Sequence, residues 1–269
     1  MIHNVLFDLD GTLTDPKEGI TRCIQFSLTR LGRKAPAADA LLWCIGPPLR
    51  NSFARLLESD DAELLDLALN HYRERYTEIG IYENHVYPGI VPALRKIRES
   101  GRRLFLATSK PTIFATRVLD HFDLTQFFDG IHGSGIDGRL CEKTDLVAHI
   151  IRTWNLAPSL TLIVGDRVHD VIGGKSNGIM TALVTYGYGT RREIEAANSD
   201  YIFESPSELV FIRKRPFSAM AASIRRLACA AYRCTPPRSP LISLPQRKIA
   251  RFPYENHDVS IRRFRMDKS

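Results

Sequence analysis

The chain has 269 residues, of which 44% are hydrophobic and 25% are charged, a composition that is ordinary for a globular protein with a sizeable core. The sequence contains no run near the ~20 apolar residues that cross a bilayer. Its first residues do not combine a basic segment with a long apolar one, so neither a membrane span nor a secretory leader is expected. The five cysteines are scattered and lack CxxC spacing, which predicts free thiols in the reducing environment of the cytoplasm.

The net charge of +7 is distributed unevenly along the chain. Residues 213–269 carry 14 of the 37 Lys and Arg residues but only three of the 30 Asp and Glu residues. This segment therefore has a formal charge of +11, and residues 1–212 have one of −4. The basic character of the whole chain says little about the partners of residues 1–212.

The first predicted strand, residues 5–10, is an apolar run that ends on two acids (VLFDLD). From Pro16 to about Gly80, apolar residues recur at helical spacing, as they do over residues 20–31 and 64–72. This period is typical of amphipathic helices, and no strand is expected there. The segment is therefore predicted to be an all-helical insert.

After residue 87, short apolar strands alternate with helices. Strands are expected over 103–109, 160–166, 181–187 and 201–205, and a short strand followed by a loop over 127–135. Helices are expected over 90–100, 111–122, 142–154 and 168–178. Strands that alternate with helices pair in parallel and carry helices on both faces of the sheet. The expected fold class is therefore α/β, with a core formed by residues 1–15 and 86–212 and a helical insert at 16–85.

The last segment, residues 213–269, is rich in Pro, Ser and Arg and has little sustained period. We expect a basic, disordered extension. An out-of-frame extension would also produce this abrupt change in composition.

Acidic residues recur where predicted strands end. Asp8 and Asp10 end the first strand, and Asp166 and Asp170 follow the strand at 160–166. Because ligands of such sheets bind beyond the carboxyl ends of the strands, these side chains are expected to meet in one crevice. Converging carboxylates favour a hard cation such as Mg²⁺. Each acid taken singly could instead form a turn or cap a helix, which would not explain why they recur at strand ends.

An EF-hand loop is the other metal site that the segment DLDGTLTDPKE could suggest. Thr12 and Leu13 stand where that motif requires an oxygen ligand followed by glycine. A strand also precedes the acids, where the motif requires a helix. This alternative is therefore rejected.

Candidate anion-binding residues lie at two further places. Thr108 and Ser109 end a predicted strand just before a helix, where hydroxyls and the helix N-terminus favour an oxyanion. Lys143 stands near the start of another helix, where a bound phosphate would offset its unfavourable position against the helix dipole. Ordinary capping and a solvated surface lysine are the alternatives.

Four segments carry a resemblance to a known family: FDLDGTLTD, LATSKP, the lysine of CEKTD, and VGDRVHDVIGGKSNG. In this order and spacing, over roughly residues 3–210, they resemble the four motifs of the haloacid dehalogenase superfamily of phosphatases. The YPG segment and the helical insert are similar to the subgroup with a helical cap between motifs one and two. That subgroup includes phosphoglycolate phosphatases, and several segments resemble bacterial 5′-nucleotidase-like members. The resemblance implies a Rossmann-like core with residues 16–85 as its cap.

The resemblance also implies roles for the matching residues. Asp8 would be the nucleophile that forms an aspartyl-phosphate, and Asp10 would protonate the leaving oxygen and later deprotonate the hydrolytic water. Thr108 and Lys143 would bind the transferring phosphoryl group.

A Mg²⁺ cofactor is implied in the same way. Its ligands would be Asp8, the backbone carbonyl of Asp10, and Asp166, with Asp170 supporting the metal through water or a neighbouring contact.

The cap is expected to select the substrate, because it closes over the crevice. Candidate contacts are Arg22, Pro47, Pro48 and Arg50, with GPPLR as a rigid loop that presents an arginine to an anionic substrate. A solvated arginine on a helix is an equally good explanation for each of the two arginines.

Three functions are weighed. The first is a Mg²⁺-dependent phosphomonoesterase that acts on a small metabolite, such as phosphoglycolate or a nucleoside 5′-monophosphate. The second is a phosphomutase of the same fold, similar to β-phosphoglucomutase. The third is non-specific binding of nucleic acid or an anionic surface through the basic tail.

Overall fold

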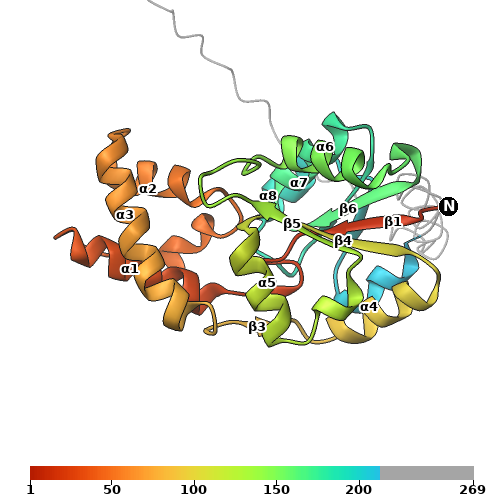
Figure 1. Ribbon diagram of the computed structural model, residues 1–269, viewed down its shortest axis with the longest axis horizontal. Helices are drawn as coiled ribbons and strands as arrows, with labels where there is room; N and C mark the ends of the chain where they lie inside the picture. The colour runs from red at the N-terminus through yellow and green to blue at the C-terminus, as the bar shows by residue number, and fades with distance from the viewer. Residues whose placement is uncertain (213–269) are drawn as a thin grey trace, which may run out of the picture. The chain divides into compact units, whose positions relative to one another are not determined.

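A computed structural model describes residues 1–212, so the expectations about the tail lie outside the described residues. A six-stranded sheet has the order β5-β4-β1-β6-β7-β8, and every neighbouring pair is parallel. Its strands are β1 (Asn4–Phe7), β4 (Arg103–Pro111), β5 (Gly130–Ser134), β6 (Thr161–Gly165), β7 (Met180–Val184) and β8 (Tyr201–Phe203). Figure 1 shows β1 between β4 and β6. The expected parallel sheet is confirmed.

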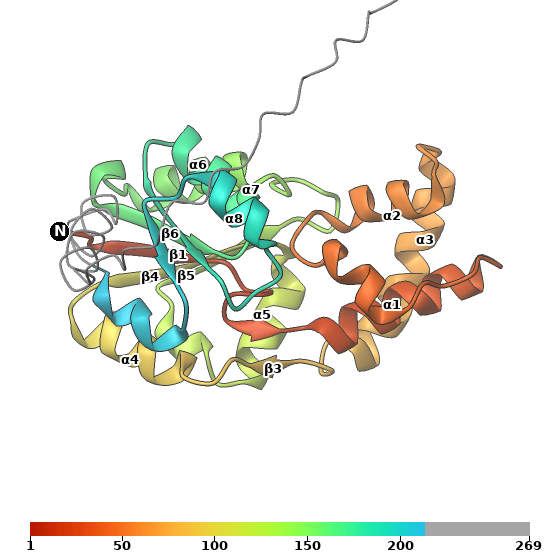
Figure 2. The same ribbon diagram turned by 180° about the vertical axis from the view of Figure 1, so that it is seen from behind.

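Helices cover both faces of the sheet (Figures 1 and 2). One face carries α4 (Ile90–Glu99) and α5 (Thr112–His121), and the other carries α6 (Lys143–Trp154), α7 (Val168–Ser176) and α8 (Arg191–Ala197). Successive side chains of β1 alternate between the two layers, since Val5 and Phe7 pack with α4 and α5 whereas Leu6 packs with α6. All residues of β1 are buried, as a strand covered on both faces requires.

Between the first strand and the rest of the sheet, the chain is helical. It forms α1 (Lys17–Arg30), η1 (Ala38–Cys44), α2 (Leu49–Leu57), α3 (Ala62–Arg75) and η2 (Tyr76–Gly80). A short antiparallel ribbon of β2 (Thr14–Asp15) and β3 (His85–Val86) brings the two ends of this segment together. The chain therefore leaves and re-enters the sheet region at one place. We call residues 16–85 the cap below.

One local expectation is corrected, and one helix was not predicted. The first strand ends at Phe7 rather than at residue 10, because the chain turns directly after it. Leu9 O accepts hydrogen bonds from the N–H groups of residues 12–14, and Gly11 has φ +83°. The helix α8 and the 3₁₀ helix η5 (Pro206–Phe211) follow β7 and β8. The sequence patterns did not predict α8 because its seven residues are mostly polar.

Two smaller expectations can be compared with the same residues. Cys23, Cys44 and Cys141 carry free thiols. No helix within residues 1–212 is both long and apolar enough to cross a membrane.

Candidate active site

The residues predicted to act in catalysis and in phosphate and metal binding meet near the carboxyl ends of three adjacent strands. Phe7, the last residue of β1, is opposite Leu106 of β4 and Val164 of β6. The residues that follow these positions are therefore neighbours, and Asp8 N–H donates to Val164 O at 2.9 Å. This register brings the first and fourth motifs together although more than 150 residues separate them.

Three of the predicted acids form a candidate metal centre. One carboxylate oxygen each from Asp8, Asp166 and Asp170 lies within 4.8 Å of the others, and all three residues are buried. Asp166 Oδ2 accepts a hydrogen bond from the N–H of Tyr188 at 2.7 Å, whereas the buried Asp166 Oδ1 has no hydrogen-bond partner. Burial, followed by the neighbouring Asp8 and Asp170, raises the pKa of Asp166 well above its usual value. An unpartnered carboxylate oxygen in this acidic group fits a divalent cation.

Lys143 lies inside this group and not on the surface. Its Nζ is 2.9 Å from Asp8 Oδ1 and 2.6 Å from Asp170 Oδ1, and it donates to Ala107 O at 2.7 Å. Burial alone would lower the pKa of Lys143, but Asp170 and Asp8 outweigh it, so the net shift is upward and the ammonium stays charged. The lysine thus joins the ends of β1, β4 and α7.

Asp10 lies beside this group, and its carboxylate pairs with a residue that we did not single out from the sequence. Lys110 Nζ is 2.6 Å from Asp10 Oδ1, and both side chains are at most 10% exposed. Burial raises the pKa of Asp10, although Lys110 partly opposes the shift. Lys110 also lies 5.4 Å from the centroid of the Tyr76 ring, which belongs to the cap. The signal for this lysine was its position in TSKP, directly after the two hydroxyl residues.

The two hydroxyl residues differ in their contacts. Thr108 is buried, and its Oγ1 accepts a hydrogen bond from Lys110 N–H at 3.3 Å. Ser109 Oγ donates to Cys141 O at 3.0 Å. Both line the cleft described next. Thr108 also holds the backbone at Lys110, whereas Ser109 links β4 to the segment before α6.

A cleft of about 320 Å³ lies between these strand ends and the cap. Its lining includes Asp8, Asp10, Thr108 and Ser109 together with apolar and aromatic cap residues. The cap contributes Ile20, Cys44, Gly46, Pro47, Pro48, Leu49, Arg50, Asn51, Asp66, Leu69, Tyr72, Arg73 and Tyr76. The two prolines and Arg50 therefore line the cleft, and their contact with a substrate stays a prediction.

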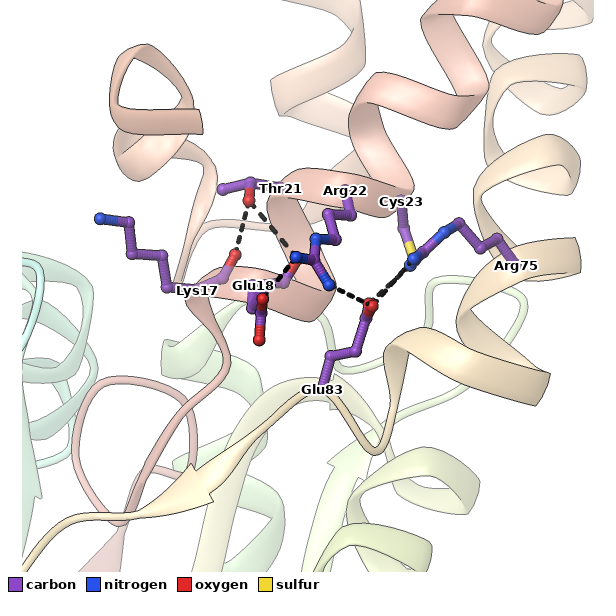
Figure 3. Close-up of polar contacts among 7 residues, drawn as sticks. All are labelled: Lys17, Glu18, Thr21, Arg22, Cys23, Arg75 and Glu83. Atoms are coloured by element: carbon purple, nitrogen blue, oxygen red, sulfur yellow. Dashed lines mark hydrogen bonds and ion pairs between the residues drawn. The ribbon is translucent and has the colours of Figure 1, made fainter. Parts of the chain in front are cut away.

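Arg22 does not line this cleft, which corrects its expected position. Its guanidinium pairs with Glu18 on the same helix and with Glu83 in the segment before β3 (Figure 3). Helical spacing alone does not say which way an exposed side chain of α1 points.

Of the two arginines that line the cleft, Arg50 is paired within the cap. Its guanidinium contacts the carboxylate of Asp66. Arg73, which we did not predict, donates from Nη2 to Ile136 O in the core at 3.1 Å. Arg73 thus connects α3 of the cap to the loop after β5.

The chain is similar to known proteins in both sequence and structure. The family model described as haloacid dehalogenase-like hydrolase matches residues 5–184. A Pseudomonas aeruginosa protein named 5′-nucleotidase is 44% identical over 193 residues, which cover 72% of this chain and 87% of that protein. A Mycobacterium tuberculosis protein named tyrosine-protein kinase PtkA is 36% identical over 198 residues, or 74% of this chain and 67% of that one. The crystal structure of a predicted phosphatase from Clostridium acetobutylicum superposes with a TM-score of 0.76 at 38% identity and covers 78% of this chain and 97% of that chain.

Proposed function

Because the chain belongs to the haloacid dehalogenase-like hydrolase family, we propose that it is a Mg²⁺-dependent phosphatase that hydrolyses a small phosphate monoester. The observation that carries the proposal is the buried group of Asp8, Asp166 and Asp170 around Lys143, with the Asp10–Lys110 pair beside it. Asp8, Asp10 and Lys110 of this arrangement line a cleft under the cap. If these acids only capped helices or formed turns, three buried carboxylates would not need to lie together, and their burial at one place is costly without a cation.

In the proposed reaction, a carboxylate oxygen of Asp8 attacks phosphorus and the bond from phosphorus to the leaving oxygen breaks. Asp10 donates its proton to that oxygen, so that the alcohol departs neutral. Asp10 then takes a proton from the water that attacks the aspartyl-phosphate, which restores Asp8 and releases inorganic phosphate. The raised pKa of Asp10 supports this role, since the first step needs its protonated form.

The other residues neutralise and orient the phosphoryl group. Lys143 is fixed by Asp8 and Asp170, so its ammonium is ready to neutralise a phosphoryl oxygen beside the nucleophile. Thr108 supplies a hydroxyl donor near the end of β4, whereas the hydroxyl of Ser109 donates to Cys141 O. Mg²⁺ held by Asp8, Asp166 and the carbonyl of Asp10, with support from Asp170, would supply further positive charge for the phosphoryl group.

The lining of the cleft favours a substrate that has an apolar or planar part in addition to its phosphate. Leu69, Tyr72, Tyr76 and Phe114 form an apolar and aromatic wall above the polar floor. A nucleoside 5′-monophosphate fits this pattern and agrees with the name of the 44% identical relative. Phosphoglycolate, which is smaller, would leave much of this wall without contact.

The nucleophile gives the direct test. We expect Asp8→Asn to abolish phosphate release from para-nitrophenyl phosphate in Mg²⁺, because an amide cannot form the acyl phosphate. The matched control is Asp39→Asn, an exposed aspartate on the cap that pairs with Lys17, and it should retain full activity. The wild-type protein should lose activity in EDTA and regain it with Mg²⁺.

Full activity of Asp8→Asn would contradict the mechanism. A phosphomutase would instead convert an added sugar 1-phosphate into its 6-phosphate isomer with little release of inorganic phosphate. Screening nucleoside monophosphates and phosphoglycolate in the same assay then separates the two substrate classes.

A further inference from the structure

Arg167 connects the segment between β6 and α7, which carries the candidate metal ligand Asp166 and is called the metal-binding loop below, to the cap. It directly follows Asp166 and precedes α7, and its Nε lies 3.0 Å from Glu193 Oε1 of α8. The same oxygen accepts a hydrogen bond from Val168 N–H at 2.8 Å. The side chains of Arg167 and Glu193 are only 12% and 16% exposed, so the direction of the guanidinium is fixed by a partly buried pair.

The far end of the same guanidinium reaches the cap. Arg167 Nη1 donates to Ile45 O, the backbone carbonyl of the first residue of the cap loop, which we define as residues 45–48. The next residue, Gly46, has φ +102°, and a Cβ added there would lie 2.8 Å from Arg167 Cγ. Glycine thus permits both the backbone conformation and the close approach of the arginine.

The cap loop itself borders the cleft. Gly46, Pro47 and Pro48 line it, and two prolines leave the loop little freedom once its first carbonyl is held. Arg167, which follows β6, therefore holds the cap loop that forms one wall of the cleft.

We propose that Arg167, braced by Glu193, is a positioning residue that holds the cap loop in its substrate-binding place. The proposal rests on the proposed phosphatase function, because its kinetic consequence is weaker substrate binding. Arg167 acts through the loop, so its loss should raise KM more than it lowers kcat. If Arg167 only stabilised the packing of α7 against α8, its loss would instead lower the stability of the protein and leave KM unchanged.

Two variants break the contact from opposite sides in the full chain. Arg167→Lys keeps a positive charge near Glu193, but a single ammonium cannot also reach Ile45 O in the geometry of the guanidinium fork. Gly46→Ala leaves the Arg167–Glu193 pair in place and displaces the loop. For each we expect KM for para-nitrophenyl phosphate to rise roughly tenfold, the size expected for one lost hydrogen bond to a charged group, with kcat within about twofold.

The matched control is Arg191→Lys. Arg191 also pairs with a glutamate of α8, Glu195, but the two side chains are 92% and 63% exposed. This variant should leave KM and kcat unchanged. The double variant Arg167→Lys/Gly46→Ala should have a KM close to that of either single variant, because both remove the same contact.

Fluorescence quenching of a nearby tryptophan measures the position of the cap loop independently of catalysis. Trp43 stands two residues before Ile45, and the only other tryptophan, Trp154, is on α6. In a Trp154→Phe background, acrylamide quenching of Trp43 should increase in both loop variants and stay unchanged in Arg191→Lys.

The outcomes separate the two proposals. Unchanged KM and unchanged Trp43 quenching in both loop variants would overturn the positioning role. A lower kcat at constant KM would overturn it as well, because Arg167 would then act on the metal-binding loop alone. If the wild-type protein releases no phosphate while Trp43 quenching still responds, the proposed function fails and the loop contact stands.

Discussion

At the scale of residues, Asp8 and Asp10 stand two positions apart and yet have different partners. Asp8 pairs with Lys143, and Asp10 pairs with Lys110. A buried carboxylate is costly unless a cation lies beside it, so the two lysines make two neighbouring acids compatible with burial. Each acid thus has its own cation, and burial still leaves the pKa of Asp10 raised although Lys110 partly opposes the shift.

Lys110 is therefore expected to matter for the reaction although it carries no covalent step. In Lys110→Met, we expect kcat for para-nitrophenyl phosphate to fall roughly a hundredfold, because Asp10 loses the contact that orients its carboxyl group for proton transfer. Steady-state kinetics with circular dichroism as a check of folding would measure this. Lys17→Met is the control, since Lys17 pairs with Asp39 at a similar 2.7 Å but on the surface. A kcat within twofold of wild type would show that Asp10 does not depend on Lys110.

At the scale of elements, the two long helices of the cap are joined where the chain leaves it. Glu83 lies between Arg22 of α1 and Arg75 of α3, and Arg75 contacts both carboxylate oxygens, at 2.7 and 2.9 Å (Figure 3). Gly19 N–H also donates to the backbone oxygen of Glu83 at 3.0 Å. Bidentate pairs of this kind fix geometry as well as charge. The segment before β3 is thus attached to both helices.

Glu83→Gln should lower the free energy of unfolding by about 1–2 kcal/mol at pH 7, since the pair is partly buried. Hydrogen bonds from Arg75, followed by those from Arg22, hold the pKa of Glu83 below its unfolded value of 4.5. A lowered pKa stabilises the folded state above pH 4.5, and this stabilisation is lost as the pH falls through the folded-state pKa. The difference between wild type and variant should therefore shrink in acid. Urea unfolding at several pH values would measure it.

The control for this prediction is Glu18→Gln. Glu18 also pairs with Arg22 but is 60% exposed, so its loss should change the unfolding free energy by less than about 0.5 kcal/mol. Equal effects of the two variants would show that the pair with Arg75 adds no stability.

At the scale of the whole molecule, charge is separated along the chain. Residues 1–212 are mildly acidic, and residues 213–269 hold a formal charge of +11. Polyanion binding through such a segment depends on counterion release and carries no sequence information. Any such binding is therefore expected to be independent of the phosphatase site.

This gives a prediction for the complete chain. Full-length protein should be retained on heparin at about 50 mM salt and released as the salt rises to a few hundred millimolar, whereas residues 1–212 should pass through. Activity toward para-nitrophenyl phosphate serves as the check that the shorter chain is folded. Identical elution of the two proteins would remove the binding hypothesis.

The sequence by itself determined the alternation of strands and helices and the acids at strand ends, because periodicity and turn chemistry are local properties of the chain. Asp8, Asp166 and Asp170 could also be grouped from the sequence, because the parallel strands that they follow must end at one edge of the sheet. The tertiary structure alone decided which cations serve these acids and which arginines reach the cleft. The Lys110–Asp10 pair joins residues 100 positions apart, and the contact of Arg167 with Ile45 joins residues 122 apart. Such contacts depend on the order of strands in the sheet and on the rotation of each cap helix, and no local pattern encodes either of these.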